Sequence, residues 1–176
     1  MVAKFTTDGT NKWGTAIGTT AHYSSLDALT ICPNDDLAAV TAEGLVALSK
    51  DGTVRWRDAD NGPNLNDVAC REDNELLTAG YLFHLDVSDV GDGPLGPYEA
   101  DPSLIARYDA QGALLAKTLY TMIWSGFDAM ASSEATAIQA GPGGEVTFVL
   151  YGGSDKIFDV GDGPIYGGSF LLRRYE

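Results

Sequence analysis

Two acidic, glycine-rich segments hold the residue types best suited to binding chemistry. The hexapeptide DVGDGP occurs twice, at 89–94 and 159–164, inside longer segments at 84–103 and 154–169. Calcium takes about six to eight oxygen ligands, which carboxylates and the carbonyls of glycine-rich backbone supply. The candidate metal ligands are Asp86, Asp89, Asp92, Asp155, Asp159 and Asp162. No cofactor is certain from the sequence, and calcium is the one candidate, although the spacing lacks the third carboxylate of an EF-hand.

The same acidic segments have a simpler structural interpretation. Asp-Gly and Gly-Pro pairs form turns, and aspartate side chains accept hydrogen bonds from the N–H groups of such turns. The duplication of an acidic hexapeptide favours a cation site, because closely spaced like charges are costly unless they are exposed or neutralised. Both interpretations stay open at this point.

A set of aromatic residues forms a second candidate site. The segment 120–134 departs from the repeat described below and contains Tyr120, Trp124 and Phe127. Aromatic residues in such a segment form carbohydrate platforms or partner hot spots, and they can also plug the open end of a fold. We expect ligand or partner binding by these three residues together with His84 and Tyr98 of the first acidic segment.

Support for catalysis is thin. The only histidines are His22 and His84, and no serine or cysteine stands in a nucleophile elbow. His84 with Asp86 could act as a general base, but a histidine in a surface loop is far more often inert. The sequence therefore predicts a binding protein rather than an enzyme. The alternative is a hydrolase or lyase that acts on glycans through the acidic residues.

The elements that must position these segments are short strands that recur along the chain. VAKFTTDGTNKW at 2–13 returns as LVALSKDGTVRW at 45–56, a third copy runs from 104 to 117, and a shortened one ends the chain. Asp-Gly between two apolar runs indicates a β-hairpin, because glycine accepts the positive φ of the turn. Trp13 and Trp56 stand four residues after the glycine, and this shared register favours docking of neighbouring units over stacking on sugars.

A second strand pair lies between these hairpins. The segments 27–44, 66–83 and 135–153 align, and each reads as apolar strand, polar turn and apolar strand. Four strands per unit predict an all-β fold of β-propeller-type blades, with about three repeats and a partial blade. The expected units are 1–24 (partial), 25–60, 61–120 and 121–176 of a single propeller or propeller fragment. A β-sandwich or barrel is the alternative.

The ends of this repeat pattern suggest further assembly. The chain reads as two strands, two units of four strands, and a final unit of three strands. Such a chain leaves unpaired strand edges at both ends, and unpaired edges accept strands from a partner. We therefore expect self-association or a larger parent propeller.

The strand I/V-A-R/K-Y/F, the turn D-x-x-G and the following Trp together resemble bacterial propeller repeats of the SBBP or delta-60 type, and more distantly PQQ-like repeats. The resemblance implies a β-propeller in an exported protein that serves as a binding, adhesion or protein-interaction scaffold. Quinone binding is not carried over, because the residues that hold the quinone cannot be located in this sequence.

Charge and cysteine content narrow the partners and the location. The net charge of −14 would repel nucleic acid and anionic membranes, and no apolar run reaches the roughly 18 residues of a membrane span. Protein or carbohydrate partners and an extracellular or cell-surface location are expected, although Met1 opens no signal peptide. Cys32 and Cys70 align on the inner strands of successive units, where two buried free thiols are expected rather than a disulfide.

Overall fold

The computed structural model describes residues 1–17, 25–58, 64–82, 88–89, 94–95, 101–120, 122–123, 133–152, 157–159, 164–166 and 169–174. Its regular elements are β-strands, apart from one 3₁₀ turn, η1, at Pro142–Gly144. The prediction of an all-β fold is confirmed. In these described ranges, no helix has the length and apolar character needed to cross a membrane.

Four of the six antiparallel sheets in the described residues follow one another in a series along the chain. The first is a hairpin, named here the N-terminal hairpin, of β1 (Val2–Phe5) and β2 (Asn11–Thr15). The second sheet contains β3 (Leu26–Ile31), β4 (Leu37–Thr41), β5 (Gly44–Leu48) and β6 (Val54–Asp58). The third contains β7 (Asn64–Cys70), β8 (Leu76–Tyr81), β11 (Ser103–Tyr108) and β12 (Leu114–Tyr120). The fourth contains β14 (Ser133–Ala140), β15 (Val146–Gly152) and β18 (Ser169–Arg174).

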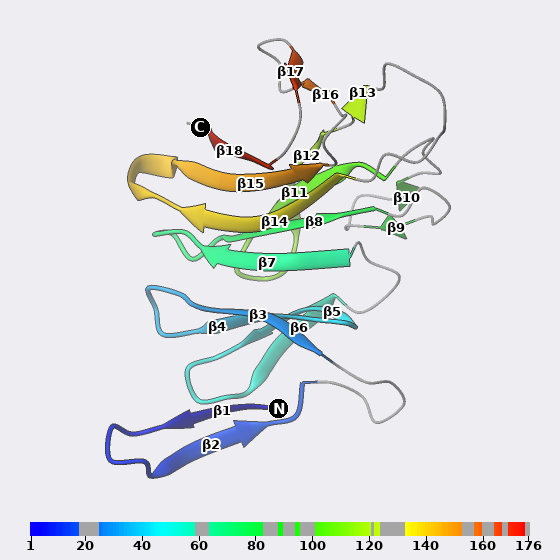
Figure 1. Ribbon diagram of the computed structural model, residues 1–176. Helices are drawn as coiled ribbons and strands as arrows, with labels where there is room; N and C mark the ends of the chain where they lie inside the picture. The colour runs from blue at the N-terminus through cyan, green and yellow to red at the C-terminus, as the bar shows by residue number, and fades with distance from the viewer. Residues whose placement is uncertain are drawn as a thin grey trace.

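Strand order within these sheets follows the chain, so the expected repeat of four-stranded antiparallel sheets is confirmed. The sheets pack face to face in series, with the N-terminal hairpin at one end and the fourth sheet at the other (Figure 1). One apolar layer fills each of the three gaps between consecutive sheets. This serial arrangement differs from the two facing sheets of a β-sandwich.

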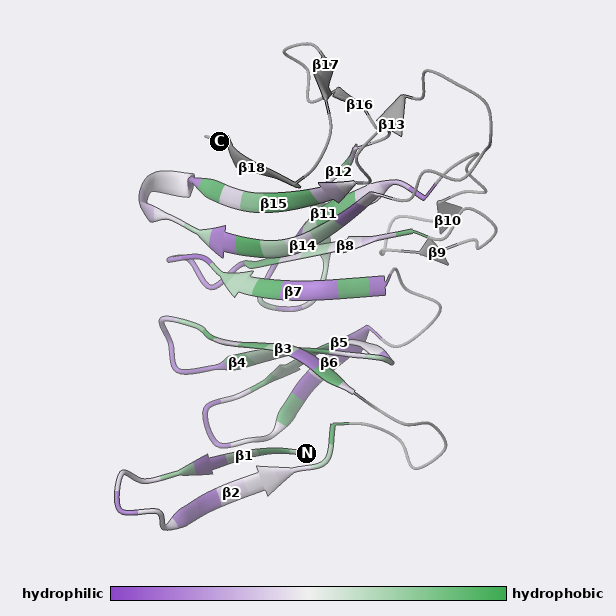
Figure 2. Cartoon of the chain, viewed as in Figure 1, coloured by the Kyte–Doolittle hydropathy of each residue, from purple (hydrophilic) through white to green (hydrophobic). Residues whose placement is uncertain are grey.

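The second strand of a sheet is apolar on both faces because a neighbouring sheet covers each face. In β4, Leu37 and Ala39 pack toward the N-terminal hairpin, whereas Ala38 and Val40 pack toward the third sheet. All five residues of β4 are buried as a result. Hydrophilic residues collect instead at the hairpin turns (Figure 2).

The first strand of the second, third and fourth sheets carries a β-bulge near its start, at Leu26/Ala28, Leu65/Asp67 and Ala135/Ala137. At the middle bulge the Asp67 carboxylate accepts hydrogen bonds from the N–H groups of Val68 (2.9 Å) and Ile138 (2.8 Å). The second bond reaches β14, so the bulge in the third sheet also anchors the fourth sheet.

Cys32 and Cys70 form a disulfide, with 5.1 Å between their Cα atoms, so the prediction of two free thiols is wrong. The alignment of the two cysteines was also wrong by one residue. Cys70 faces Leu76 at the end of β7, whereas the residue that faces Leu37 in the same place is Ile31, and Cys32 comes next. Because successive strand residues point to opposite faces, this offset turns the two thiols toward each other.

Candidate functional site

The two DVGDGP copies form the same local structure. In the first copy, Asp89 ends β9 (Ser88–Asp89) and faces Pro94, the first residue of β10 (Pro94–Leu95). In the second copy, Asp159 ends β16 (Ile157–Asp159) and faces Pro164, the first residue of β17 (Pro164–Tyr166). The duplicated hexapeptide is therefore a duplicated β-hairpin in one register. We name the two copies the DVGDGP hairpins.

Both DVGDGP hairpins belong to the same connection of their sheets. The first stands between β8 and β11 of the third sheet, and the second between β15 and β18 of the fourth. In Figure 1 they project beyond the sheets, on the side away from the β1–β2 turn. The repeat of the sheets thus brings both hairpins to one edge of the stack.

The aromatic segment 120–134 reaches this edge through a third short strand. β13 (Met122–Ile123) pairs with β16, so that Met122 faces Phe158 and Ile123 faces Ile157. β13, β16 and β17 form a three-stranded sheet, while β9 and β10 form a separate pair. Two of the three segments expected to form a binding face are therefore in direct contact.

Most of the individual candidate residues fall outside the described part of the chain. Asp89 and Asp159 lie in described strands. The candidates outside the described residues are Asp86, Asp92, Asp155, Asp162, His84, Tyr98, Trp124 and Phe127. In the part of the chain that the structure describes, no three His, Cys, Asp or Glu side chains gather as metal ligands.

Tyr120 also lies in the described part of the chain, and the expectation that it departs from the repeat is wrong. It is the last residue of β12 and faces Ser103 across the sheet. Its side chain is 9% exposed, and its ring centroid lies 5.3 Å from that of Phe148 on the fourth sheet. The strand continues to Tyr120 because the apolar face of the fourth sheet extends that far and buries the ring.

Two carboxylates lie close to the end of the strand that leads into the first acidic segment. Tyr81 ends β8, just before the first acidic segment. Burial, followed by the nearby carboxylates of Glu134 and Asp101, raises the pKa of the Tyr81 phenol. Burial is the larger cause, and the two carboxylates add to it because like charge disfavours the ionised phenolate.

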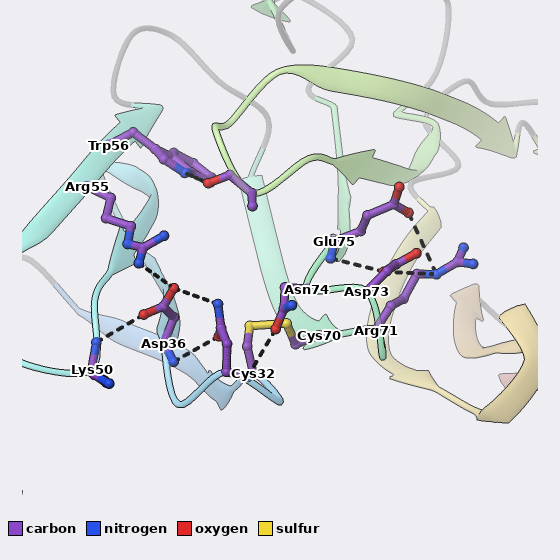
Figure 3. The surroundings of a disulfide bond; sticks show 12 residues. Cys32, Asp36, Lys50, Arg55, Trp56, Cys70, Arg71, Asp73, Asn74 and Glu75 are labelled. Atoms are coloured by element: carbon purple, nitrogen blue, oxygen red, sulfur yellow. Dashed lines mark hydrogen bonds and ion pairs between the residues drawn. A yellow bond between two sulfur atoms is a disulfide. The ribbon is translucent and has the colours of Figure 1, made fainter.

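A second polar cluster, at the opposite edge, was not found from the sequence (Figure 3). Asp36 accepts hydrogen bonds from the Lys50 N–H and the Asn34 side-chain amide, and it pairs with Arg55 at 3.0 Å. The Asn34 N–H donates to Oδ1 of Asn74 on the third sheet at 3.1 Å, beside the disulfide. The Asp36 contacts fix the turns of the second sheet, and the Asn34–Asn74 bond joins that sheet to the third, so we assign the cluster a structural role.

Two short polar turn sequences could have predicted this cluster. PNDD at 33–36 and EDNE at 72–75 connect equivalent strands. Each turn holds one non-glycine residue at positive φ, Asp35 at 67° and Asn74 at 66°. Asp and Asn tolerate this conformation better than other side chains do. The equivalence of the two turns would have revealed the correct register of the cysteines.

No protein-family model matches the chain, and no curated protein gives a significant match. The candidate site therefore rests on its own geometry.

Proposed function

We propose that the chain is part of a β-propeller-type scaffold in an exported bacterial protein and that it binds a protein or carbohydrate partner without catalysing a reaction. The binding face is the edge with the two DVGDGP hairpins and the segment 120–134. The observation that carries the proposal is the pairing of β13 with β16, which joins the aromatic segment to an acidic hairpin.

The sheet arrangement supports a propeller-type scaffold. Blades of a propeller are four-stranded antiparallel sheets arranged around an axis, each covered by its neighbours. The second and third sheets have this strand count and order, and apolar layers join all consecutive sheets. The disulfide supports export, because such bonds persist mainly in oxidising compartments.

Calcium is the ion that best suits the binding face. Both DVGDGP hairpins place an aspartate at the same position before the turn. The carboxylates of Glu134 and Asp101 lie near Tyr81, which ends the strand before the first acidic segment. Outside cells, calcium sites function with dissociation constants of about 10⁻⁴–10⁻³ M. Calcium would hold the acidic turns in one arrangement and so preorganise the face for its partner.

Thermal unfolding with millimolar calcium and with a chelator tests this function. Calcium bound only to the folded chain stabilises it by about 2.7 kcal/mol at one hundred times its dissociation constant. We expect a clear rise in Tm, and its loss in the double variant Asp92→Asn and Asp162→Asn. The matched control, Asp27→Asn with Asp35→Asn, removes two charges elsewhere and should keep the response.

Two results would contradict the proposal. If the Tm did not respond to calcium, the aspartates of the DVGDGP hairpins would serve only to form turns. An equal loss of response in the control variant would show a general effect of net charge rather than a site.

A further inference from the structure

Tryptophan joins the first three sheets through a repeated contact. The Trp13 indole lies on the turn at Gly52 of the second sheet and donates to the Lys50 carbonyl at 3.0 Å. The Trp56 indole lies on the turn at Gly112 of the third sheet and donates to the Ala110 carbonyl, also at 3.0 Å. Lys50 and Ala110 both stand two residues before the glycine. We name this element the Trp-docking turn.

The glycine of a Trp-docking turn is required by close approach. A Cβ at Gly52 would lie 2.6 Å from the Trp13 ring, and one at Gly112 would lie 2.7 Å from the Trp56 ring. Both glycines also have positive φ, 86° and 88°. The turn is therefore shaped both by its own backbone and by the indole upon it.

The N-terminal hairpin contains a third turn of this geometry, at Gly9, on which no indole of the described residues docks. Gly9 has φ 84°, and the Gly9 N–H donates to the Thr6 carbonyl at 2.9 Å, as the Gly52 N–H does to Ser49. No heavy atom of the described residues lies within 4 Å of a Cβ placed at Gly9. The geometry that accepts an indole is present without the indole.

The same end of the stack exposes apolar side chains that are covered in the other sheets. Phe5 of β1 is 57% exposed, whereas its counterparts on the third strands of the next two sheets, Leu48 and Tyr108, are at most 1% exposed. On the first strands, Leu29 of β3 is 46% exposed, whereas its counterpart Val68 is 4% exposed. Phe5 and Leu29 are therefore exposed at positions that a preceding sheet covers elsewhere in the stack.

The N-terminal hairpin also lacks inner strands among the described residues. β5 lies between β4 and β6, and β11 lies between β8 and β12, but β1 pairs only with β2. An unpaired strand edge beside an apolar face accepts further strands. We name the edge of β1, the Gly9 turn, Phe5, Leu29 and Ile31 the open face.

We propose that the open face binds a further unit of this same repeat, made of strands equivalent to β2, β3 and β4. The two inner strands would pair with the free edge of β1 and cover Leu29 and Ile31. The outer strand would place its tryptophan on the Gly9 turn. Continuity with the two occupied Trp-docking turns identifies this occupant, and the proposal is independent of the acidic hairpins.

An extended chain tests the proposal directly. Residues 11–44 are added before residues 2–176, so that Val2 follows an added Gly44 as Leu45 does in the original chain. We expect one cooperative unfolding transition at a higher Tm, and slower hydrogen exchange of the β1 amides. Gly9→Ala should lower the Tm by about 4 °C more in the extended chain than in the original, because the new Cβ would then meet an indole.

The matched control replaces the added copy of Trp13 with alanine in the extended chain. It should return the effect of Gly9→Ala to its value in the original chain. The proposal is overturned if Gly9→Ala has the same effect in both chains, or if the extended chain unfolds in two separate transitions. A dimer of the original chain that Phe5→Asp dissociates would also overturn it, since a second copy would then be the occupant.

Discussion

The two faces of the second sheet differ in how completely a neighbouring sheet covers them. Toward the third sheet, an apolar layer spans inner and outer strands, and the disulfide, the Asn34–Asn74 hydrogen bond and Trp56 close it. Toward the N-terminal hairpin, Trp13 and the bonds from Arg57 to the carbonyls of Ala16 and Ile17 close only the outer part.

This difference teaches that the contact between sheets has two separable parts. The outer part is a tryptophan on a hairpin turn, and it is the same at both interfaces. The inner part buries the first strand. It is complete between the second and third sheets, where Val68 is buried, but not between the N-terminal hairpin and the second sheet, where Leu29 is exposed. Variants at matched positions can therefore measure each part.

The largest effect should come from removing the disulfide that links the second sheet to the third. The disulfide closes a loop between residues 38 apart in sequence. Loop-closure entropy predicts that Cys32→Ala with Cys70→Ala lowers the free energy of unfolding by about 3–4 kcal/mol. Urea unfolding with and without reductant checks this. Reductant should not change the stability of the double variant. If reductant also left the stability of the parent chain unchanged, the assignment of the disulfide would be contradicted.

The next prediction compares equivalent residues on two equivalent strands, one buried (Leu48 on β5) and one exposed (Phe5 on β1). Leu48 is fully buried, so Leu48→Ala should cost about 3 kcal/mol in loss of contacts and cavity formation. Phe5 occupies the equivalent place on β1 but is exposed, so Phe5→Ala should cost less than about 1 kcal/mol. Chemical denaturation of the two variants measures both. Equal losses would mean that Phe5 is covered.

A smaller effect separates the strain of a turn from the contact upon it. Gly52→Ala and Gly9→Ala impose the same positive-φ strain, but only the first places a methyl group against an indole. The overlap should add about 2 kcal/mol to the cost of Gly52→Ala. Thermal unfolding of both variants measures the difference between the two costs. A difference near zero would contradict the close contact between the Trp13 ring and Gly52.

The smallest effect concerns the pKa values of Asp8 and Asp51, which should be lowered alike in the Gly9 and Gly52 turns. The Ser49 hydroxyl and then the Thr53 N–H lower the pKa of Asp51, and Thr6 and Thr10 lower that of Asp8 in the same way. A lowered folded-state pKa gives stability that is present above the unfolded pKa and is lost as the pH falls through the folded value. Titration of both carboxyls by NMR should show similar pKa values below 3.8, and a marked inequality would mean that docking alters the turn.

The sheets and the docking role of tryptophan were predictable because they repeat. The Asp-Gly turns fix each outer hairpin locally, and Trp13 and Trp56 then fall on the same face in the same register. Local spacing therefore carries enough information to place these residues, even though the contact partners lie 37 and 54 residues away.

The remaining features depend on information that spacing does not carry. The disulfide depends on a one-residue offset beside a turn, which reverses the direction of a side chain. Tyr120 is buried because the fourth sheet extends to it, and that sheet is distant in sequence. The pairing of β13 with β16 joins two strands of two and three residues, too short to give an alternating pattern.

A thermodynamic cycle between Trp13 and Gly52 tests the central claim, that one repeated tryptophan contact joins the N-terminal hairpin to the second sheet and the second sheet to the third. The free energies of unfolding of Trp13→Ala, Gly52→Ala and the double variant are compared with that of the parent chain. Without the Trp13 ring, the cost of Gly52→Ala should fall to that of Gly9→Ala, since only the strain of the turn remains. An unchanged cost of Gly52→Ala in the absence of Trp13 would contradict the account.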